Sequence, residues 1–332
     1  MKVSVVIITY NQEKYIRQAL DGVVSQQTDF PFEVIVADDC STDDTLAVCR
    51  DFESKYSFVK VEQSDKNLGY SKNWERALSL GSGEYLAIFE GDDYWTDNLK
   101  IQKQVDYLDS HNDCGVCYTD CDIFNEDTKV IQSDIFANRI CVFNSENPFL
   151  SEGYPSNVTW MIRRETLNSM GILVPEKHPD VPWLLLYELC PHTTIGFLPE
   201  NTGVWRLHTG SYSNGENVEK MYKYQRAVFL WRKNYIPVFP ESERNATEIY
   251  TWALINLWTY ANEIGDKTII DDISDFFSSR INIQMLGNCM TNSANKIQTL
   301  QNDIAGLQKS LRYRIGSIIL CPFLLIKKLL EK

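Results

Sequence analysis

Short apolar runs alternate along the first ninety residues with segments in which apolar residues recur at helical spacing. The runs are rich in β-branched residues, which is typical of strands buried on both faces of a sheet, and they cover residues 3–9, 34–37, 58–61 and 85–89. The spacing predicts helices over residues 12–25, over a segment capped by Ser41 or Thr42 with Asp43 and Asp44 in its first turn, and over residues 71–80. Strands and helices that alternate in this order predict an α/β fold with a mostly parallel central sheet.

The pattern changes twice beyond this region. It is irregular from Cys114 onward, where short strands are predicted at 158–162, 195–198 and 204–207, and after residue 216 it is helical, over 221–233 and 241–264. Six aromatic residues in the helical part are interpreted as packing residues: Tyr222, Tyr224, Phe229, Trp231, Trp252 and Trp258. We therefore predict a first domain at residues 1–215, with halves at 1–110 and 111–215, then a helical region at 216–294 and a tail at 295–332.

Composition excludes several classes of protein. The chain has 332 residues, 32 Lys and Arg against 45 Asp and Glu, and a formal net charge of −13. So acidic a chain argues against a nucleic-acid-binding protein, because nucleic acids are bound mainly through their negative phosphates. No apolar run reaches the length that a spanning helix needs. The nine cysteines are scattered and odd in number, which indicates a cytoplasmic protein without a disulfide framework.

Three of the cysteines, Cys114, Cys117 and Cys121, resemble half of a zinc site. No second pair of cysteines and no spaced pair of histidines follows them, and the residues around them predict a strand. We therefore interpret them as reduced cysteines in and around a strand.

The tail is basic, unlike the rest of the chain. Residues 295–332 carry seven Lys or Arg and two Asp or Glu, and basic residues bracket an apolar run at 315–326. As a helix that run is about 18 Å long, too short to span a hydrocarbon core of about 30 Å. We predict an interfacial helix within 312–332 that contacts an anionic membrane surface. The alternatives are a helix docked on the protein and, for the heptad-like apolar positions at 283–311, the pairing of two chains into a homodimer.

Polar residues collect where the four predicted strands end. In chain order they are Thr9, Tyr10 and Asn11, then Asp38 and Asp39, then Asn67 and Gly69, then Asp92 and Asp93. In an open α/β sheet, the carboxyl ends of parallel strands form the edge at which ligands bind. We therefore expect a binding site at this edge.

The segment from Glu90 to Asp93 has three carboxylates in four residues. Like charges so close together repel one another unless a cation offsets them. Oxygen ligands suit Mg²⁺ or Mn²⁺, which proteins usually hold with one or two carboxylates plus the phosphates of a substrate. Because the chain has neither a phosphate-binding P-loop nor a dinucleotide fingerprint after the first strand, the pattern favours a metal–diphosphate complex held by side chains.

Taken together, these segments resemble the family 2 inverting glycosyltransferases. The resemblance rests on residues 5–11, 36–45, 67–69 with Asn73, and 83–93, in that order. It implies the A-type glycosyltransferase fold, a Rossmann-like catalytic domain in which residues 1–110 bind a nucleotide sugar and 111–215 the acceptor. It also implies transfer of a sugar, with inversion, from a UDP- or dTDP-sugar to an acceptor hydroxyl. The acceptor is expected to be a saccharide or lipid-linked saccharide in the synthesis of a bacterial surface polysaccharide.

The resemblance assigns residues to the donor. Those implied to bind the nucleotide sugar are Thr9, Tyr10, Asn11, Asp38, Asp39, Asn67, Gly69, Lys72, Asn73, Glu90, Asp92 and Arg206. Of these, Asp38 and Asp39 correspond to carboxylates that contact the base and the ribose, and Arg206 is expected to meet the charge of the diphosphate. Glu90 stands where the family has an aspartate in its Asp-x-Asp motif.

Metal ligands and a catalytic base are implied in the same way. Asp92, Asp93 and His208 are the expected ligands of Mn²⁺ or Mg²⁺. An inverting transfer needs a base that takes the proton of the acceptor hydroxyl. Asp180 is the candidate for that base, with Glu188 as the second choice.

Two other functions share some of these features. A nucleotidylyltransferase has a similar sheet, but it needs a glycine-rich signature after the first strand, where this chain has Thr9, Tyr10 and Asn11. A non-catalytic scaffold that binds nucleotide sugars is the other alternative, and the intact acidic pairs at the strand ends argue against it. The expected location is the cytoplasm, with the inner face of the cell membrane as an alternative.

Overall fold

The computed structural model describes residues 1–138, 143, 154–170 and 181–209, and in the C-terminal part 222–223, 226, 229–230, 257–258 and 260–280. Asp180, the predicted tail and the heptad-like stretch lie outside the described residues. The chain divides into two compact units, Met1–Asn214 and Gly215–Lys332.

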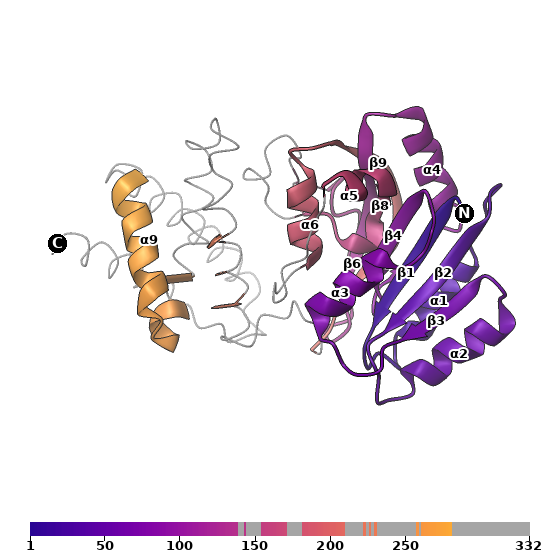
Figure 1. Ribbon diagram of the computed structural model, residues 1–332, viewed down its shortest axis with the longest axis horizontal. Coiled ribbons are helices and arrows are strands. Elements are labelled where there is room, and N and C mark those ends of the chain that lie inside the picture. Colours follow the sequence, from indigo (N-terminus) through magenta and orange to yellow (C-terminus); the bar gives the residue numbers. More distant parts are fainter. Residues whose placement is uncertain are drawn as a thin grey trace. The chain divides into compact units, whose positions relative to one another are not determined.

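The first four strands form a parallel sheet in the order β3-β2-β1-β4 (Figure 1). Their bounds are Val3–Thr9 for β1, Phe32–Asp38 for β2, Val59–Gln63 for β3 and Tyr85–Glu90 for β4. Helices α1 (Ile16–Val24), α2 (Thr45–Lys55) and α3 (Tyr70–Ser79) connect them in turn. The four strands and three helices expected from the sequence are therefore all present, within a few residues of the predicted bounds.

The sheet continues beyond β4 with strands of both directions. Across the described residues the order is β3-β2-β1-β4-β8-β6-β9-β5, and β7 pairs with β6. The added strands are β5 (Tyr94–Trp95), β6 (Cys114–Asn125), β7 (Val130–Gln132), β8 (Trp160–Arg163) and β9 (Thr194–Leu207). Strand β8 is antiparallel to both of its neighbours, and β9 is parallel to β6. Six of these nine strands thus run in one direction, which confirms the predicted α/β fold, and two of the predicted short strands are parts of the single strand β9.

Helices cover both faces of this sheet (Figure 1). One apolar core joins the sheet to α1, α2 and α4 (Lys100–Ser110), and cores on the opposite face join it to α3 and α6 (Val181–Leu189). In β1, Val5 and Ile7 belong to the first core, whereas Val6 and Ile8 pack under α3. This burial on both faces is why β1 is a continuous apolar run in the sequence.

The start of α2 differs from the prediction. The helix begins at Thr45, after Asp43 and Asp44 rather than before them, and neither Ser41 nor Thr42 caps it. Instead the Asp43 carboxylate accepts a hydrogen bond from the backbone N–H of Thr45 (3.0 Å). Ser41 and Thr42 are bonded to neighbouring strand ends, so the helix starts only after the chain has formed this loop.

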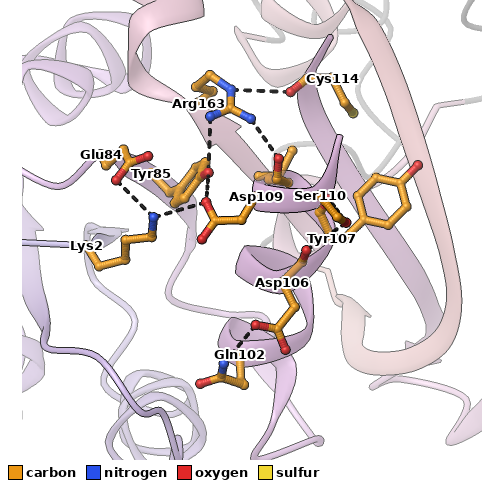
Figure 2. A network of polar contacts seen from close by, with 11 residues as sticks. Lys2, Glu84, Tyr85, Gln102, Asp106, Tyr107, Asp109, Ser110, Cys114 and Arg163 are labelled. Carbon is orange, nitrogen blue, oxygen red and sulfur yellow. Dashed lines mark hydrogen bonds and ion pairs between the residues drawn. The ribbon is translucent and has the colours of Figure 1, made fainter. Parts of the chain in front are cut away.

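Polar contacts fasten α4 to the amino edge of the sheet, opposite the edge where the polar strand ends meet (Figure 2). Arg163 donates to the Tyr85 hydroxyl (3.1 Å) and to the carbonyl of Leu108 (2.9 Å). The Tyr85 hydroxyl in turn donates to Asp109, whose carboxylate also binds the Lys2 ammonium (3.0 Å). The groups in this network satisfy one another, which indicates a structural role.

The first residue of α4 is a fully buried lysine. Lys100 is 0% exposed, donates to the carbonyl of Thr159 (3.0 Å) and lies over the ring of Trp95, 5.4 Å from its centre. Burial lowers the pKa of Lys100 to about 7, because the charged ammonium loses its hydration. The neighbouring cysteines of β6, Cys117 and Cys121, are buried and not in disulfides, as expected of cysteines in a strand.

We expect Lys100→Met to stabilise the protein most at pH 7 and below. Below pH 7 the lysine is charged in both the folded and the unfolded chain, and each tenfold weakening of its proton binding on folding costs about 1.4 kcal/mol of stability. Between pH 7 and the ordinary lysine pKa of 10.5, the unfolded chain binds more protons than the folded one, so the cost shrinks as the pH rises. Urea unfolding of wild type and Lys100→Met at pH 7 and about pH 9.5 measures this, and a stability difference that does not change with pH contradicts it.

The second unit is helical where it is described. Helix α9 spans Lys267–Arg280, and Tyr222, Phe229 and Trp258 are buried, as expected of packing residues. The other three aromatic residues of that prediction, Tyr224, Trp231 and Trp252, lie outside the described residues. Among the helices that the structure describes, none has both the length and the apolar character needed to cross a bilayer.

Candidate functional site at the carboxyl ends of the strands

The register of the sheet brings the polar strand ends together. Thr9 of β1 is aligned with Asp38 of β2, and Ile8 is aligned with Glu90 of β4. At the same edge, Asn125 at the end of β6 is aligned with Leu207 at the end of β9. The segments that the sequence marked as a binding site therefore meet at one edge, and β6 and β9 join them there.

The loops after β1 and β2 are bonded to each other. Asn11 and Cys40 both adopt left-handed backbone conformations, with φ of 53° and 62°. The N–H of Asn11 donates to the Ser41 hydroxyl (3.0 Å), and the N–H of Thr42 donates to the Asn11 side chain (2.8 Å). Between these fixed loops Tyr10 is 44% exposed, so its ring is accessible to a ligand.

Both carboxylates at the end of β2 are buried and bonded within the protein. Asp38 accepts hydrogen bonds from the backbone N–H (3.1 Å) and the hydroxyl (2.5 Å) of Ser41. Asp39 accepts from the N–H groups of Leu68 (2.8 Å) and Gly69 (2.9 Å) and so holds the loop before α3. In this structure the pair shapes the predicted nucleotide pocket, and direct contact with a base or a ribose stays a prediction.

The next candidates lie on α3, in the loop before it and at the end of β4. Asn73 is buried and donates to the carbonyl of Ala37 (3.1 Å), whereas Asn67 and Lys72 are exposed. The Glu90 carboxylate accepts hydrogen bonds from the Tyr70 hydroxyl (2.8 Å) and from the Trp74 indole (3.1 Å). Glu90 thus joins β4 to α3.

Asp92 and His208 form the centre of the site. The His208 Nε2 and Asp92 Oδ2 atoms lie 3.1 Å apart, although the two residues are 116 positions apart in the chain. The His208 ring also packs against Tyr15, with 4.6 Å between the ring centres. Gly91, just before Asp92, lies close to the start of α1, where an added side chain would meet those of Ile16 and Gln12. The structure therefore brings together two of the three predicted metal ligands.

Asp93, the third predicted ligand, is directed inward. It is 3% exposed, and its carboxylate accepts a hydrogen bond from the backbone N–H of Arg206 (2.8 Å). Burial raises the pKa of Asp93, and the negative charge of Asp92 raises it further. In this structure the Asp93 carboxylate stabilises the neighbouring strand and does not join Asp92 and His208, unlike the geometry expected of a third ligand.

Arg206 also differs from its expected role. Its guanidinium donates to the carbonyl of Asp92 (2.9 Å), to the Glu126 carboxylate (2.5 Å) and to the Gln18 amide oxygen (2.6 Å). Since the residue is 6% exposed, its guanidinium is bonded within the protein in this structure rather than open to a diphosphate.

Three residues of this centre were missed in the sequence. Tyr15 precedes α1, Gln18 lies in its first turn and Glu126 follows β6. None of them belongs to a motif, and Gln18 is 188 positions away from Arg206. Their role follows only from the tertiary structure.

The chemistry of Asp92 and His208 fits a divalent cation that arrives with a substrate. Among the described residues, no group of three or more His, Cys, Asp or Glu side chains is arranged to hold a metal ion. The two side chains are 16% and 11% exposed, so a cation between them remains accessible to a ligand. Mg²⁺ and Mn²⁺ commonly take one or two protein ligands and complete their coordination with water and phosphate oxygens.

Comparison with known proteins identifies the family. The sequence profile of the family described as Glycosyl transferase family 2 matches residues 4–171, about half of the chain. The match includes β1 to β4 and the segment with Asp92. The chain belongs to glycosyl transferase family 2. This confirms the resemblance seen in its motifs.

Relatives within the family are found in several bacteria. An uncharacterized protein of Mycobacterium tuberculosis is 36% identical over 215 residues, which cover 62% of this chain and 58% of that protein. The poly(ribitol-phosphate) beta-N-acetylglucosaminyltransferase TarS of Staphylococcus aureus is 38% identical over 116 residues, 34% of this chain and 20% of TarS. The abequosyltransferase RfbV of Salmonella typhimurium is 32% identical over 129 residues, 37% of this chain and 38% of RfbV. The similarity thus spans less than two thirds of each relative.

Solved structures show the same fold at low sequence identity. A TarS fragment in complex with UDP-GlcNAc has a TM-score of 0.53 and 21% identity, and the match covers 87% of this chain and 80% of that one. The mannosyltransferase PcManGT of Pyrobaculum calidifontis, in complex with GDP-Man and Mn²⁺, has a TM-score of 0.58 and 17% identity over 99% of this chain and 87% of that one. These similarities support the fold of the family.

Proposed function

We propose that the protein is an inverting glycosyltransferase that moves a sugar from a nucleoside-diphosphate sugar to an acceptor hydroxyl. The observation that carries this proposal is the pairing of Asp92 with His208 at the sheet edge where Tyr10 is exposed. A glycine-rich phosphate loop is not required, because a cation between these two side chains supplies the charge that a diphosphate needs.

Asp92 and His208 would hold a Mn²⁺ or Mg²⁺ ion in this reaction. When bound, such a cation neutralises the negative charge that develops on the nucleoside diphosphate as it leaves the sugar. The Asp92 carboxylate would supply the negative charge that binds the cation, and the His208 imidazole would supply a nitrogen ligand. Tyr15, packed against the His208 ring, fixes the orientation of that imidazole.

Asp180 is the proposed base for the acceptor. It directly precedes α6, whose first residue, Val181, is buried in the core beside α3. A carboxylate at this position takes the proton of the acceptor hydroxyl as its oxygen attacks the sugar. Glu188, on α6 itself, stays the second choice.

The remaining parts of the proposal concern the substrates and the location. Relatives are named as transferases of N-acetylglucosamine onto poly(ribitol-phosphate) and of abequose, which supports a saccharide or lipid-linked saccharide acceptor in surface-polysaccharide synthesis. A UDP- or dTDP-sugar is the proposed donor.

We place the reaction in the cytoplasm, at the inner face of the membrane, where residues 312–332 contact anionic lipid. Sedimentation with anionic liposomes, with and without these residues, tests that contact, and equal sedimentation argues against it.

A donor screen tests the function. The purified protein is incubated with UDP-, dTDP- and GDP-sugars and Mn²⁺, and release of nucleoside diphosphate is measured with and without EDTA. We expect release from one class of donor, and loss of that release when EDTA removes the metal. Pyrophosphate release from a nucleoside triphosphate and a sugar phosphate would instead indicate a nucleotidylyltransferase. Thermal stabilisation by a nucleotide sugar without any release would indicate a scaffold.

A further inference from the structure

We propose that Arg206 is a positioning residue, which fixes the backbone of Asp92 and Asp93 so that the Asp92 carboxylate faces His208. The inference rests on the proposed function, because it concerns the metal-binding geometry of that site. It assigns to Arg206 an action through Asp92, without contact with the donor.

The guanidinium joins three separate parts of the chain. Its Nε donates to the carbonyl of Asp92 (2.9 Å), one Nη to Glu126 after β6 (2.5 Å), and the other Nη to Gln18 in α1 (2.6 Å). All three nitrogen atoms are thus engaged, each in a different direction. Through Arg206, the backbone of Asp92 is therefore held in place relative to α1 and to the residue that follows β6.

The backbone around Arg206 adds a second set of bonds. The N–H of Arg206 donates to Asp93 (2.8 Å), and the N–H of Glu126 donates to the carbonyl of Leu207 (2.7 Å). His208 follows one residue later. The end of β9 is therefore bonded to Asp93 and to Glu126, and His208 follows it directly. One network of hydrogen bonds thus fixes the positions of both candidate metal ligands.

Aromatic rings enclose the guanidinium. The rings of Tyr15 and Tyr94 have their centres 5.0 Å from its central carbon, and that of Phe124 lies at 5.5 Å. Cation–π contact stabilises the charge, and the neighbouring Glu126 carboxylate balances it. Tyr15 also packs against His208, so the same ring contacts both Arg206 and the second candidate metal ligand.

Lysine does not satisfy these contacts. A guanidinium is planar and directs donors along fixed axes, whereas a lysine ammonium is a compact charge at the end of a flexible chain. Arg206→Lys keeps the charge but loses at least one of the three bonds. Replacing groups that orient a metal ligand typically weakens metal binding by about 10- to 100-fold.

The test measures Mn²⁺ binding directly, by electron paramagnetic resonance of free Mn²⁺ in the presence of UDP. We expect the Mn²⁺ dissociation constant of Arg206→Lys to rise about tenfold. At saturating Mn²⁺, the KM for the donor should stay near the wild-type value, because Arg206 does not contact the donor. Arg50→Lys, at an exposed position of α2, is the matched control and should bind Mn²⁺ like the wild type.

Two further variants, Gln18→Ala and Glu126→Gln, each weaken one bond to Arg206, and thermal unfolding checks the fold of every variant. We expect both to weaken Mn²⁺ binding, to a smaller extent than Arg206→Lys. Unchanged Mn²⁺ binding in folded Arg206→Lys, or a raised donor KM at saturating Mn²⁺, overturns the inference. If Arg206→Lys does not fold, unchanged Mn²⁺ binding in the other two variants overturns it. Wild-type metal binding in Asp92→Asn would be a failure of the proposed function itself, so the two results are distinguishable.

Discussion

Asp92→Asn is expected to lower the rate of sugar transfer by about a hundredfold or more, at least ~2.7 kcal/mol of barrier. The substitution keeps the shape of the side chain and removes the charge that faces His208. Transfer should be measured at saturating donor and Mn²⁺, and thermal unfolding should show an intact fold. Wild-type rates in Asp92→Asn under these conditions would exclude the metal role of this carboxylate.

Asp93→Asn is the matched control, since it makes the same change one residue later. The Asp93 carboxylate is buried against the N–H of Arg206, and an amide oxygen can accept that hydrogen bond. We therefore expect Asp93→Asn to retain most of the activity. If Asp93→Asn were as inactive as Asp92→Asn while still folded, the sequence-based assignment of Asp93 to the metal would regain support.

Asp180→Asn is expected to have the second large effect, a fall in kcat of about 10²- to 10⁴-fold, the usual contribution of a general base. The donor KM should change little, because the proton is transferred only in the transition state. Steady-state kinetics with donor and acceptor, together with donor binding by calorimetry, separate the two effects.

Glu188→Gln is the comparison for that experiment. It alters the second candidate, which lies on α6. A normal rate in Asp180→Asn, combined with a large loss in Glu188→Gln, would move the base to α6. Normal rates in both variants would exclude both carboxylates.

The N-terminal half of the fold could be predicted because each of its strands and helices is determined by residues close together in the sequence. The β-branched run of β1 and the helical spacing of α1 each depend on neighbouring residues, and both are present as expected. The meeting of Thr9 with Asp38 follows from the rule that parallel strands align their carboxyl ends. The fold and the meeting of these strand ends at one edge could therefore be predicted from the sequence.

The roles of individual residues at the site were less accessible. The family resemblance implies both Asp92 and Asp93 as metal ligands, with Asp92 as the main one, and only the tertiary structure shows that one faces His208 and the other the N–H of Arg206. Arg206 was assigned to the diphosphate, but in this structure its guanidinium is paired with the carboxylate of Glu126, 80 positions away. Such assignments depend on partners far apart in the chain, for which spacing gives no signal.

A crystal structure with Mn²⁺ and the nucleoside diphosphate of the active donor tests the central claim most directly. We expect an anomalous signal for Mn²⁺ between the Asp92 carboxylate and the His208 imidazole. We also expect diphosphate oxygens on the metal, the nucleoside beside Tyr10 and no contact from Asp93. A metal held by Asp93, or a nucleotide bound away from the carboxyl ends of β1, β2 and β4, would contradict it.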